Sequence, residues 1–361
     1  MQKTVIVCVT NDLSTDQRVH KTCLTLQKCG YWVIATGRLL PESLTLELDY
    51  FTLRRKLRFK KGPLFYAEFN IRLFLYLLSK KVDLIYANDL DTLPAAFLAS
   101  RIRNKRLIFD AHELFSEVPE LTHRPFIKWI WQKMEDCIIP RIQQSITVCE
   151  SIAEYYHRKY QVEMKVVRNI PISRKTNQTK KISFPNKKII LYQGAINVGR
   201  GLEWVIDAMP LIENAILVII GNGDIKQKLE KRTREIGVEN KVQFLGVISG
   251  DMLHEYTSSA DIGLCLLENK GLNYYYALPN RIFDYLQAKV PVLATRFPEI
   301  ENIVEKHKTG VLINQYDPAY LAKTINDMLS TPFETSHFEV ISKELSWENE
   351  EKILMSVINE Q

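Results

Sequence analysis

The sequence has few of the features that mark exported, membrane-spanning or metal-stabilised proteins. Its first apolar run, residues 5–9, is too short for a signal-peptide core or a membrane span. It contains no C-x-x-C pair, no histidines at zinc-finger spacing and no segment of low complexity. The six cysteines lie at positions 8, 23, 29, 137, 149 and 265, several of them in apolar runs, where free thiols behave as small hydrophobic side chains. We therefore expect a cytoplasmic protein without a structural metal.

Length and composition are those of a globular protein with more than one core. At 361 residues the chain exceeds the size at which single cores usually stop growing, which favours two domains. Hydrophobic residues make up 46% and charged residues 25%, which is ordinary for globular proteins. The net charge of +6 is uneven, because residues 1–165 hold 25 Lys and Arg against 18 Asp and Glu. The basic surplus therefore belongs to the first half.

Both halves alternate short apolar runs with segments of helical periodicity. The apolar runs of the first half read TVIVCV, WVIATG, VDLIYA, RLIFDA, SITVCE and KVVRNI. Those of the second half read KIILYQG, AILVIIG, KVQFLG, DIGLCLL, VPVLAT and GVLI. Such alternation predicts α/β architecture, with two Rossmann-like, doubly wound parallel sheets covered by helices. Ligands of such sheets bind beyond the carboxyl ends of the strands, and two domains can face a central cleft.

A polar, basic stretch without periodicity separates the two halves. It covers residues 170–188 and has the composition of a linker. We therefore predict a first domain at 1–169 and a second domain at 189–345. The last segment, residues 346–361, has helical periodicity with Ser346 as its N-cap, and it follows a loop with no strand after it.

Polar side chains follow several predicted strands of the first half. They are Asn88, Asp89 and Asp91 after LIYA, Asp110, His112 and Glu113 after RLIF, and Glu150 after ITVC. A lone loop histidine is most often bonded to backbone, yet these neighbours favour a functional role for His112. The string NDLD resembles an Asp-x-Asp element that binds divalent cations. Because Asp91 and Thr92 directly precede a helical run, we interpret them instead as a helix cap, which needs no metal.

Two glycine-containing loops of the second half have the composition of phosphate-binding loops. YQGAINVGRG places Gly194 and Arg200 between a strand and a helix, where backbone can approach a diphosphate and a guanidinium can bind it. IIGNGD ends the next strand with Gly221, Asn222 and Gly223. The absence of a Cβ lets a ligand approach there, although a tight turn explains the pattern equally well.

A third loop of the second half ends in a predicted helix. In GLNYYYALPNRIFDYLQ, Pro279 suits the first turn of a helix, which we predict over 279–288 after a loop at 273–278. The free N–H groups at a helix start favour phosphate. Together the three loops predict a phosphate or nucleotide site in the second domain.

These motifs, in this order, resemble the retaining glycosyltransferases of family four, which have the GT-B fold. The second half is similar to their donor-binding domain through YQGAINVGRGLEWVIDAM, IIGNGDIKQKLEKRTREIG and YALPNRIFDYLQAKVPVLAT. The first half agrees through DQRVHKTCLTLQKCGYWVIATG, LIYANDLDTLPAAFLA and LIFDAHELFSE. The resemblance covers nearly the whole chain. It implies transfer of a sugar from a UDP- or GDP-sugar to a hydroxyl acceptor, in the assembly of a cell-surface polysaccharide or glycolipid.

The resemblance also implies roles for individual residues. His112 and Arg200 are the expected catalytic residues, near the transferred sugar and the diphosphate. Asp284 corresponds to the second glutamate of the family's Glu-x7-Glu element, which meets the ribose hydroxyls. The expected donor-binding residues are Gly194, Arg200, Gly221, Asn222, Gly223, Tyr276, Asn280, Arg281 and Asp284. The expected acceptor-binding residues are Arg18, Asp89, Glu113 and Glu150.

The resemblance implies no metal and no cofactor, since the nucleotide sugar is a co-substrate. Preorganised cations and helix N–H groups would stabilise the charge on the leaving diphosphate. The leaving phosphate would take the acceptor proton, so that no carboxylate nucleophile is required. The C-terminal helix would cross back onto the first domain. We expect no nucleic-acid partner.

Two positions depart from the family's pattern. The first glutamate of the element falls on Tyr276, which can hydrogen-bond to a sugar hydroxyl but supplies no carboxylate. The arginine that commonly follows the glycine of the first donor loop falls on Ala195. An alternative function is therefore a catalytically silent subunit that binds a nucleotide sugar or a partner transferase. A nucleotide-sugar epimerase of the same fold is a third reading, without motif support.

A basic segment of the first half, residues 54–61, holds six Lys and Arg and no acidic residue. The predicted helix after it has a narrow polar face at Glu68, Arg72 and Ser79 and is otherwise apolar. A core helix behind a solvated loop explains this pattern. Because each basic residue near an anionic leaflet contributes roughly 1 kcal/mol, we also expect peripheral attachment to the inner face of the cytoplasmic membrane. A lipid-linked saccharide could then be the acceptor.

Overall fold

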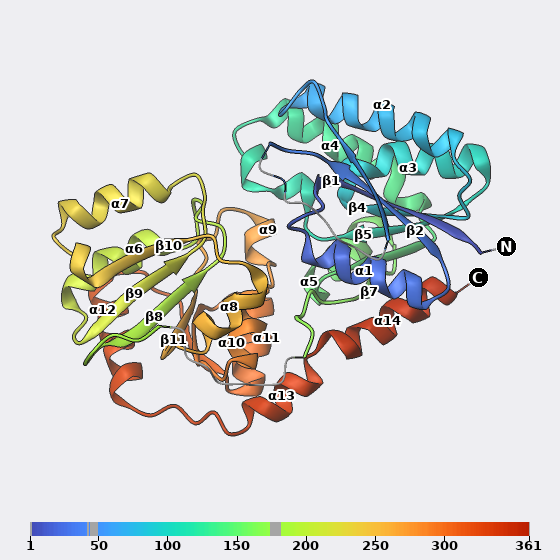
Figure 1. The fold of residues 1–361 in the computed structure, drawn as a ribbon. Helices are drawn as coiled ribbons and strands as arrows, with labels where there is room; N and C mark the ends of the chain where they lie inside the picture. The colour runs from blue at the N-terminus through green and yellow to red at the C-terminus, as the bar shows by residue number, and fades with distance from the viewer. Residues whose placement is uncertain (1, 42, 44–49, 174–181, 361) are drawn as a thin grey trace. The chain divides into compact units, whose positions relative to one another are not determined.

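The computed structural model describes residues 2–41, 43, 50–173 and 182–360. The chain divides into two compact units, which we call unit 1 (Met1–Asn169 with Glu350–Gln361) and unit 2 (Ile170–Asn349). Each unit is a parallel sheet with helices on both faces (Figure 1). The predicted linker at 170–188 lies partly outside the described residues, at 174–181.

Unit 1 is built on seven parallel strands among its described residues, in the order β3-β2-β1-β4-β5-β6-β7. Their bounds are β1 Thr4–Asp12, β2 Trp32–Arg38, β3 Phe51–Arg55, β4 Leu84–Asn88, β5 Arg106–Ala111, β6 Gln144–Thr147 and β7 Lys165–Val166. The central strand β4 is buried over its whole length, as expected for an apolar run with helices on both faces. The helices are α1 Gln17–Lys28, α2 Pro63–Ser79, α3 Asp89–Arg103, α4 Pro125–Ile138 and α5 Glu150–Tyr160.

Strand β3 was not predicted, and it includes the first two residues of the basic segment at 54–61. Arg54 and Arg55 lie on this edge strand, where they pair with Gly37 and Arg38 of β2. The guanidinium of Arg55 lies 4.8 Å from the centre of the Tyr76 ring on α2. Charged residues are tolerated on an edge strand, which pairs with the sheet on one side only, so a search for apolar runs does not find it. The exposed part of the basic segment is therefore residues 56–61.

Unit 2 contains six parallel strands among its described residues, in the order β10-β9-β8-β11-β12-β13. Their bounds are β8 Lys188–Gln193, β9 Ala215–Ile220, β10 Val242–Gly246, β11 Ile262–Cys265, β12 Val292–Thr295 and β13 Gly310–Ile313. The helices are α6 Leu202–Ala208, α7 Lys226–Glu235, α8 Gly250–Thr257, α9 Leu272–Tyr275, α10 Arg281–Gln287, α11 Pro298–His307, α12 Pro318–Ser330 and α13 Phe338–Glu344. All six apolar runs predicted for this half form strands.

The segment of three tyrosines differs from its prediction. The first half of the predicted loop at 273–278 lies in the short helix α9, and the backbone N–H of Tyr276 donates to the carbonyl of Leu272 at 2.9 Å. Regular helix begins at Arg281 rather than Pro279, after a tight turn in which the N–H of Ile282 donates to the carbonyl of Pro279 at 3.1 Å. Helix α10 is thus only 7 residues long.

The C-terminal helix α14 (Trp347–Asn359) continues from unit 2 and packs on unit 1. Leu354 and Ile358 are fully buried. Glu351 accepts hydrogen bonds from Thr25 at 2.7 Å and Lys28 at 2.8 Å, both on α1. Residues distant in sequence therefore complete the core of unit 1.

Both sheets share the strand order of doubly wound folds, in which the direction of winding reverses once. The reversal lies between β1 and β4 in unit 1 and between β8 and β11 in unit 2. A crevice forms where the loops after two such strands diverge, and ligands bind there. The carboxyl ends of these four strands are therefore where each unit can hold a substrate. No helix among the described residues is long and apolar enough to cross a membrane.

Candidate active site

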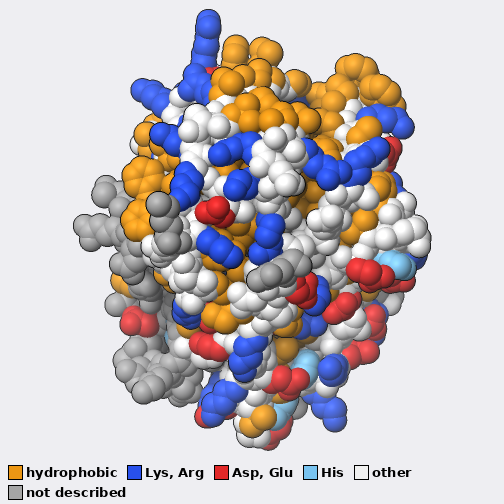
Figure 2. All heavy atoms as spheres, turned by 90° about the vertical axis from the view of Figure 1, so that its right-hand side faces the viewer, with side chains coloured by type: hydrophobic (Ala, Val, Ile, Leu, Met, Phe, Trp, Pro, Cys, Tyr) orange, Lys and Arg blue, Asp and Glu red, His pale blue; other side chains and the backbone are white. Residues whose placement is uncertain are grey.

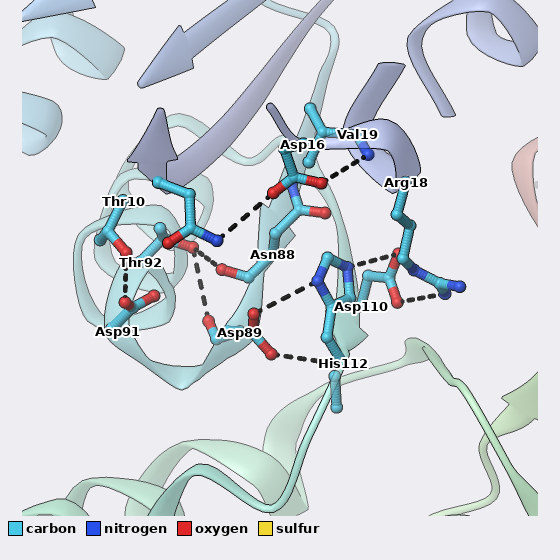
Figure 3. Close-up of polar contacts among 12 residues, drawn as sticks. Thr10, Asp16, Arg18, Val19, Asn88, Asp89, Asp91, Thr92, Asp110 and His112 are labelled. Atoms are coloured by element: carbon cyan, nitrogen blue, oxygen red, sulfur yellow. Dashed lines mark hydrogen bonds and ion pairs between the residues drawn. The ribbon is translucent and has the colours of Figure 1, made fainter. Parts of the chain in front are cut away.

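His112 lies just after β5, at the carboxyl edge of the unit 1 sheet, between two carboxylates (Figure 3). Its Nδ1 is 3.3 Å from Asp89 Oδ2, and its Nε2 is 3.3 Å from Asp110 Oδ2. The backbone N–H of His112 also donates to Asp89 Oδ1 at 2.8 Å. The ring is therefore fixed on both sides.

The two carboxylates decide the charge of the histidine. Burial alone would lower the pKa of His112, but the charges of Asp89 and Asp110 outweigh it and raise the pKa to about 9. At neutral pH the ring is a cation with both nitrogens facing acids. This geometry suits a fixed positive charge and not a general base.

Arg18 on α1 does not point to a ligand position. Its Nε and Nη2 donate to the two oxygens of Asp110 at 3.2 and 2.7 Å, and its Nη1 donates to the carbonyl of Val167 at 2.8 Å. Asp110 also accepts from the hydroxyl of Tyr86 at 2.9 Å. Burial would raise the pKa of Asp110, but Arg18 and His112 hold it well below the ordinary value. Arg18 therefore positions His112 through Asp110, whereas the sequence predicted an acceptor contact.

The start of α3 supplies the other carboxylate. Helix α3 begins at Asp89, whose φ of 58° is left-handed, a conformation that Asp tolerates better than most residues. The predicted cap at Asp91 is wrong, because Asp91 lies inside the helix, is buried and accepts from the hydroxyl of Thr10. Burial and the charge of Asp89 raise the pKa of Asp91 to about 8.

A cavity of about 370 Å³ opens beside this cluster within unit 1. Asp89, Asp91 and Glu113 line it together with cationic and aromatic side chains. Glu150, also predicted to bind the acceptor, is not among its lining residues. It is exposed at the start of α5, 3.8 Å from the guanidinium of Arg168. The structure thus brings together Asp89, His112 and Glu113 and leaves Glu150 apart.

In unit 2 the residue that stands out is Arg281, the first residue of α10. Its side chain is buried, and its Nη1 has no hydrogen-bond partner among the described residues. The guanidinium lies 4.5 Å from the centre of the Tyr192 ring and next to Gly194, at the carboxyl end of β8. No carboxylate of the described residues pairs with it. An anion would complete its coordination.

The glycines predicted to approach a ligand are needed first for the fold. The φ of Gly194 is +131° and that of Gly221 is +141°, and a Cβ on Gly221 would lie 1.9 Å from the carbonyl oxygen of Gly194. The two loops after β8 and β9 therefore touch through backbone. Gly223 packs likewise against the carbonyl of Ile196, and Asn222 is exposed between the glycines.

Arg200 lies in the same loop as Gly194. Its guanidinium is 4.9 Å from the centre of the Tyr274 ring on α9, and its Nε is buried without a hydrogen-bond partner among the described residues. Arg200 and Arg281 are thus both held against tyrosine rings and have no acidic partner among the described residues. A ring holds a guanidinium in place while leaving its N–H groups available.

Asp284 on α10 accepts from the side-chain amide of Gln193 at 2.9 Å, and Gln193 in turn accepts from Thr257 at 2.7 Å. These two hydrogen bonds orient the carboxylate of Asp284 toward the end of β8. Asn280 is exposed at the start of α10, and Tyr276 ends α9 with its ring 5.4 Å from that of Tyr275.

Several residues of these sites were not assigned a role from the sequence. They are Thr10, Tyr86, Tyr192 and Gln193. Thr10, Tyr192 and Gln193 lie near the carboxyl ends of β1 and β8, so the rule that polar residues at strand ends line the site could have selected them. Tyr86 lies in the middle of β4, and no such signal marks it. Within the described ranges, no group of three or more His, Cys, Asp and Glu side chains could hold a metal ion.

Two family models match the sequence, one for each unit. "Glycosyl transferases group 1" matches residues 173–343, and "Glycosyltransferase Family 4" matches residues 19–171. The fold and these matches define a glycosyltransferase with two Rossmann-like domains. The chain belongs to the family 4 type of glycosyltransferases with the GT-B fold.

Individual relatives agree with this family. An uncharacterized glycosyltransferase of Methanocaldococcus jannaschii is 30% identical over 148 residues, which are 40% of this chain and 36% of the relative. Chitobiosyldiphosphodolichol beta-mannosyltransferase of Candida albicans is 22% identical over 240 residues, 59% of this chain and 51% of the relative. The matches therefore span about a third to a half of these relatives' own length.

Solved structures share the fold over nearly the whole chain. An Anabaena protein in complex with UDP and glucose superimposes with a TM-score of 0.73 at 15% identity, covering 99% of both chains. Similarity at this level of identity shows the fold. It confirms the prediction of two doubly wound parallel-sheet domains in a GT-B fold.

Proposed function

We propose that this protein transfers a sugar from a UDP- or GDP-sugar to a hydroxyl acceptor, with retention of configuration, in the assembly of a cell-surface polysaccharide or glycolipid. The observation that carries the proposal is Arg281, a buried guanidinium without an acidic partner among the described residues. A permanent charge in such a position is costly unless an anion joins it, and a diphosphate is such an anion. The Anabaena structure with UDP and glucose supports a nucleotide donor.

In the proposed reaction, the bond between the sugar carbon and the diphosphate oxygen breaks. The acceptor oxygen forms its bond to the same face of the sugar, and the hydroxyl proton passes to the leaving diphosphate. Negative charge builds on that diphosphate, and Arg281 and Arg200 stabilise it as preorganised donors. No carboxylate nucleophile or resident metal is assigned a step.

The remaining donor and acceptor contacts follow from the position of each side chain. In unit 2, Asp284 is oriented by Gln193 to accept from ribose hydroxyls, and Tyr276 takes the place of a carboxylate beside the sugar. In unit 1, Asp89 and Glu113 line the cavity proposed for the acceptor. The protonated ring of His112 supplies positive charge for the transferred sugar and its phosphate.

The first experiment asks whether a nucleotide binds at Arg281. UDP, GDP and ADP are each added, and the melting temperature is followed, since a ligand specific for the folded state raises it. We expect UDP or GDP to stabilise the protein and Arg281→Met to abolish the effect without lowering the unfolding free energy. An unchanged unfolding free energy in Arg281→Met distinguishes a ligand-binding arginine from a structural one, because removing a buried unpaired charge does not destabilise a fold.

The second experiment measures turnover with UDP- and GDP-sugars as the release of nucleoside diphosphate, with and without saccharide acceptors. Arg200→Ala should lower turnover by about a hundredfold, the loss typical when one donor to a developing anion is removed. Arg232→Ala is the matched control, because Arg232 is exposed on α7 of the same unit and pairs with Asp207. Nucleotide binding without release from any sugar would favour the catalytically silent subunit.

We also propose that unit 1 attaches peripherally to an anionic membrane. Helix α2 packs its Phe69 and Leu73 face into the core but exposes Ile71 and Leu75. On α4, Phe126 is 71% exposed and Trp129 is 52% exposed, with the rings stacked 6.1 Å apart. Hydrophobic side chains gather along the top of the face in Figure 2, with Lys and Arg side chains beside them. Exposed apolar side chains with cations beside them suit an anionic lipid surface.

Co-sedimentation with vesicles tests this attachment. The wild type should sediment with anionic vesicles, less at high salt, and only weakly with neutral ones. Phe126→Ser with Trp129→Ser should lower binding by about tenfold or more, because each ring loses its burial in lipid. Val247→Ser with Val340→Ser, two exposed positions of unit 2, is the control pair. Equal sedimentation of the wild type with both kinds of vesicle would refute the attachment.

A further inference from the structure

The cavity of unit 1 carries more positive charge than an acceptor of hydroxyl groups alone requires. It is about 370 Å³ in volume, within the range of small-molecule sites. Besides Asp89 and Glu113, its lining includes three cations, Arg38 at the end of β2 and Lys60 and Lys61 before α2. The cavity thus has a cationic wall as well as an acidic one.

The cations of this wall have no acidic partner in the part of the chain that the structure describes. Among the described residues, no carboxylate forms an ion pair with Arg38, Lys60 or Lys61. The guanidinium of Arg38 lies 5.2 Å from the centre of the Phe65 ring, and its Nε is buried without a hydrogen-bond partner within the described part of the chain. Helix α2 starts at Pro63, and its N-cap Gly62 follows Lys61 directly, so the positive end of its dipole adds to the same wall.

The acidic wall carries less negative charge than its residues suggest. Asp91 is buried beside Thr10, and its raised pKa of about 8 leaves it mostly protonated at neutral pH. Asp89 is paired with the cationic ring of His112. The cavity can therefore accept an anion without strong repulsion from these carboxyl groups.

The remaining lining suits a sugar. Carboxylate oxygens of Asp89 and Glu113 can accept hydrogen bonds from sugar hydroxyls. The ring of Tyr66 lines the same space and packs edge-on against Trp131 of α4, with the ring centres 5.1 Å apart, which keeps it in place. An aromatic wall beside acids fits a saccharide, and the three cations fit a phosphate group.

We infer that the cavity binds an acceptor that carries a phosphate or diphosphate group next to its sugar. Arg38, Lys60 and Lys61 bind the phosphate, and Asp89 and Glu113 bind sugar hydroxyls. This assignment rests on the proposed function and names its acceptor class. A lipid-linked diphosphosaccharide and a soluble sugar phosphate share this chemistry.

The test counts binding sites for inorganic pyrophosphate by calorimetric titration, so that it does not depend on turnover. The wild type should show two sites, one in each unit. Lys60→Gln with Lys61→Gln should weaken one of them by about tenfold or more, and Arg281→Met should abolish the other. Lys80→Gln with Lys81→Gln is the control pair, because it removes the same charge beyond the opposite end of α2. A Lys60 and Lys61 variant that titrates like the wild type would overturn the inference.

The design separates this inference from the proposed function. A wild type with a single pyrophosphate site, which depends on Lys60 and Lys61 and is unchanged in Arg281→Met, would contradict the donor assignment and leave the acceptor cavity standing. A second titration compares a hexose 1-phosphate, a hexosyl diphosphate with a short prenyl chain, and the free hexose. At least one phosphorylated probe should bind about tenfold or more tightly than the hexose, in a manner that depends on Lys60 and Lys61. Equal binding of all three refutes the inference, and preference for the prenyl or the soluble probe identifies the source.

Discussion

At the scale of single residues, the two units treat their buried arginines differently. Arg18 in unit 1 pairs with Asp110, which lies 92 positions away in the sequence. Arg281 in unit 2 faces the ring of Tyr192 and has an unpaired nitrogen among the described residues. A buried ion pair is complete in itself, whereas a buried charge without a partner indicates a ligand. Sequence motifs selected both arginines, but only the structure separates a positioning residue from a binding residue.

The protonation of His112 gives a prediction for stability. Its pKa is raised above the ordinary 6.5 to about 9 in the folded protein, so the folded state binds the proton more tightly than the unfolded state does. The contribution to the unfolding free energy is complete below the unfolded pKa and is lost as the pH rises through about 9. We expect a loss of about 1 to 3 kcal/mol, measured by urea denaturation between about pH 6 and about pH 10.

His112→Gln is the comparison, because a glutamine fills similar space and cannot take up a proton. Its unfolding free energy should change less than that of the wild type over the same range, and the two curves should converge at high pH. Parallel curves would show that His112 is not protonated between Asp89 and Asp110.

At the scale of secondary structure, the loops after β8 and β9 are built as a pair. The backbone of Gly194 lies so close to Gly221 that no side chain fits on Gly221. The N–H of Gly194 also donates to the carbonyl of Ile220 at 2.9 Å. The loop with Arg200 is therefore positioned by the loop with Asn222, and backbone contact couples the two.

Gly221→Ala should disrupt this pair. The new Cβ would lie 1.9 Å from the carbonyl oxygen of Gly194 at a φ of +141°, so the backbone must move. We expect a loss of roughly 2 kcal/mol or more in unfolding free energy and a loss of nucleotide-induced stabilisation. Gly237→Ala is the control, because its φ of +70° is also left-handed but open space surrounds it, and it should cost only about 1 kcal/mol. Equal effects of the two substitutions in denaturant melts would contradict the coupling.

At the scale of the whole molecule, the order of the chain and the division into units do not coincide. The last residues return to unit 1, where α14 meets α1 and the amino ends of β5 and β6. Arg106 donates to the carbonyl of Ile358 at 3.2 Å, and Gln144 donates to that of Glu360 at 3.1 Å. Unit 1 is therefore incomplete until the end of the chain has been added.

Ile358→Ala tests this dependence on the last helix. Ile358 is fully buried, so its truncation should lower the unfolding free energy of unit 1 by about 2 to 5 kcal/mol. Ile353→Ala is the control on the same helix, because Ile353 is 36% exposed. Hydrogen exchange resolves the two units, and the loss of protection should fall on the strands of unit 1. Loss of protection in unit 2 alone would contradict the assignment of residues 350–361.

The pattern of apolar runs alone predicted two doubly wound sheets, because strands buried on both faces must be apolar throughout. The pattern did not predict the edge strand β3, since an edge strand tolerates the charges of Arg54 and Arg55. The starts of two helices were also predicted at the wrong residues, Asp91 and Pro279. Several turn geometries are compatible with the residues at these positions, so the local sequence does not determine where the helix begins.

What the sequence by itself determined is the strand and helix order, the family resemblance and the loops that carry the candidate residues. Only the tertiary structure decided which of those residues meet. Asp110 and Arg18 are joined because β5 and α1 converge at one sheet edge, and Lys60 reaches the cavity of Asp89 because α2 packs on α3. Charge and burial follow from such distant contacts, which depend on packing. For this reason the chemistry of His112 and Arg281 could be located from the sequence, while their protonation and pairing required the fold.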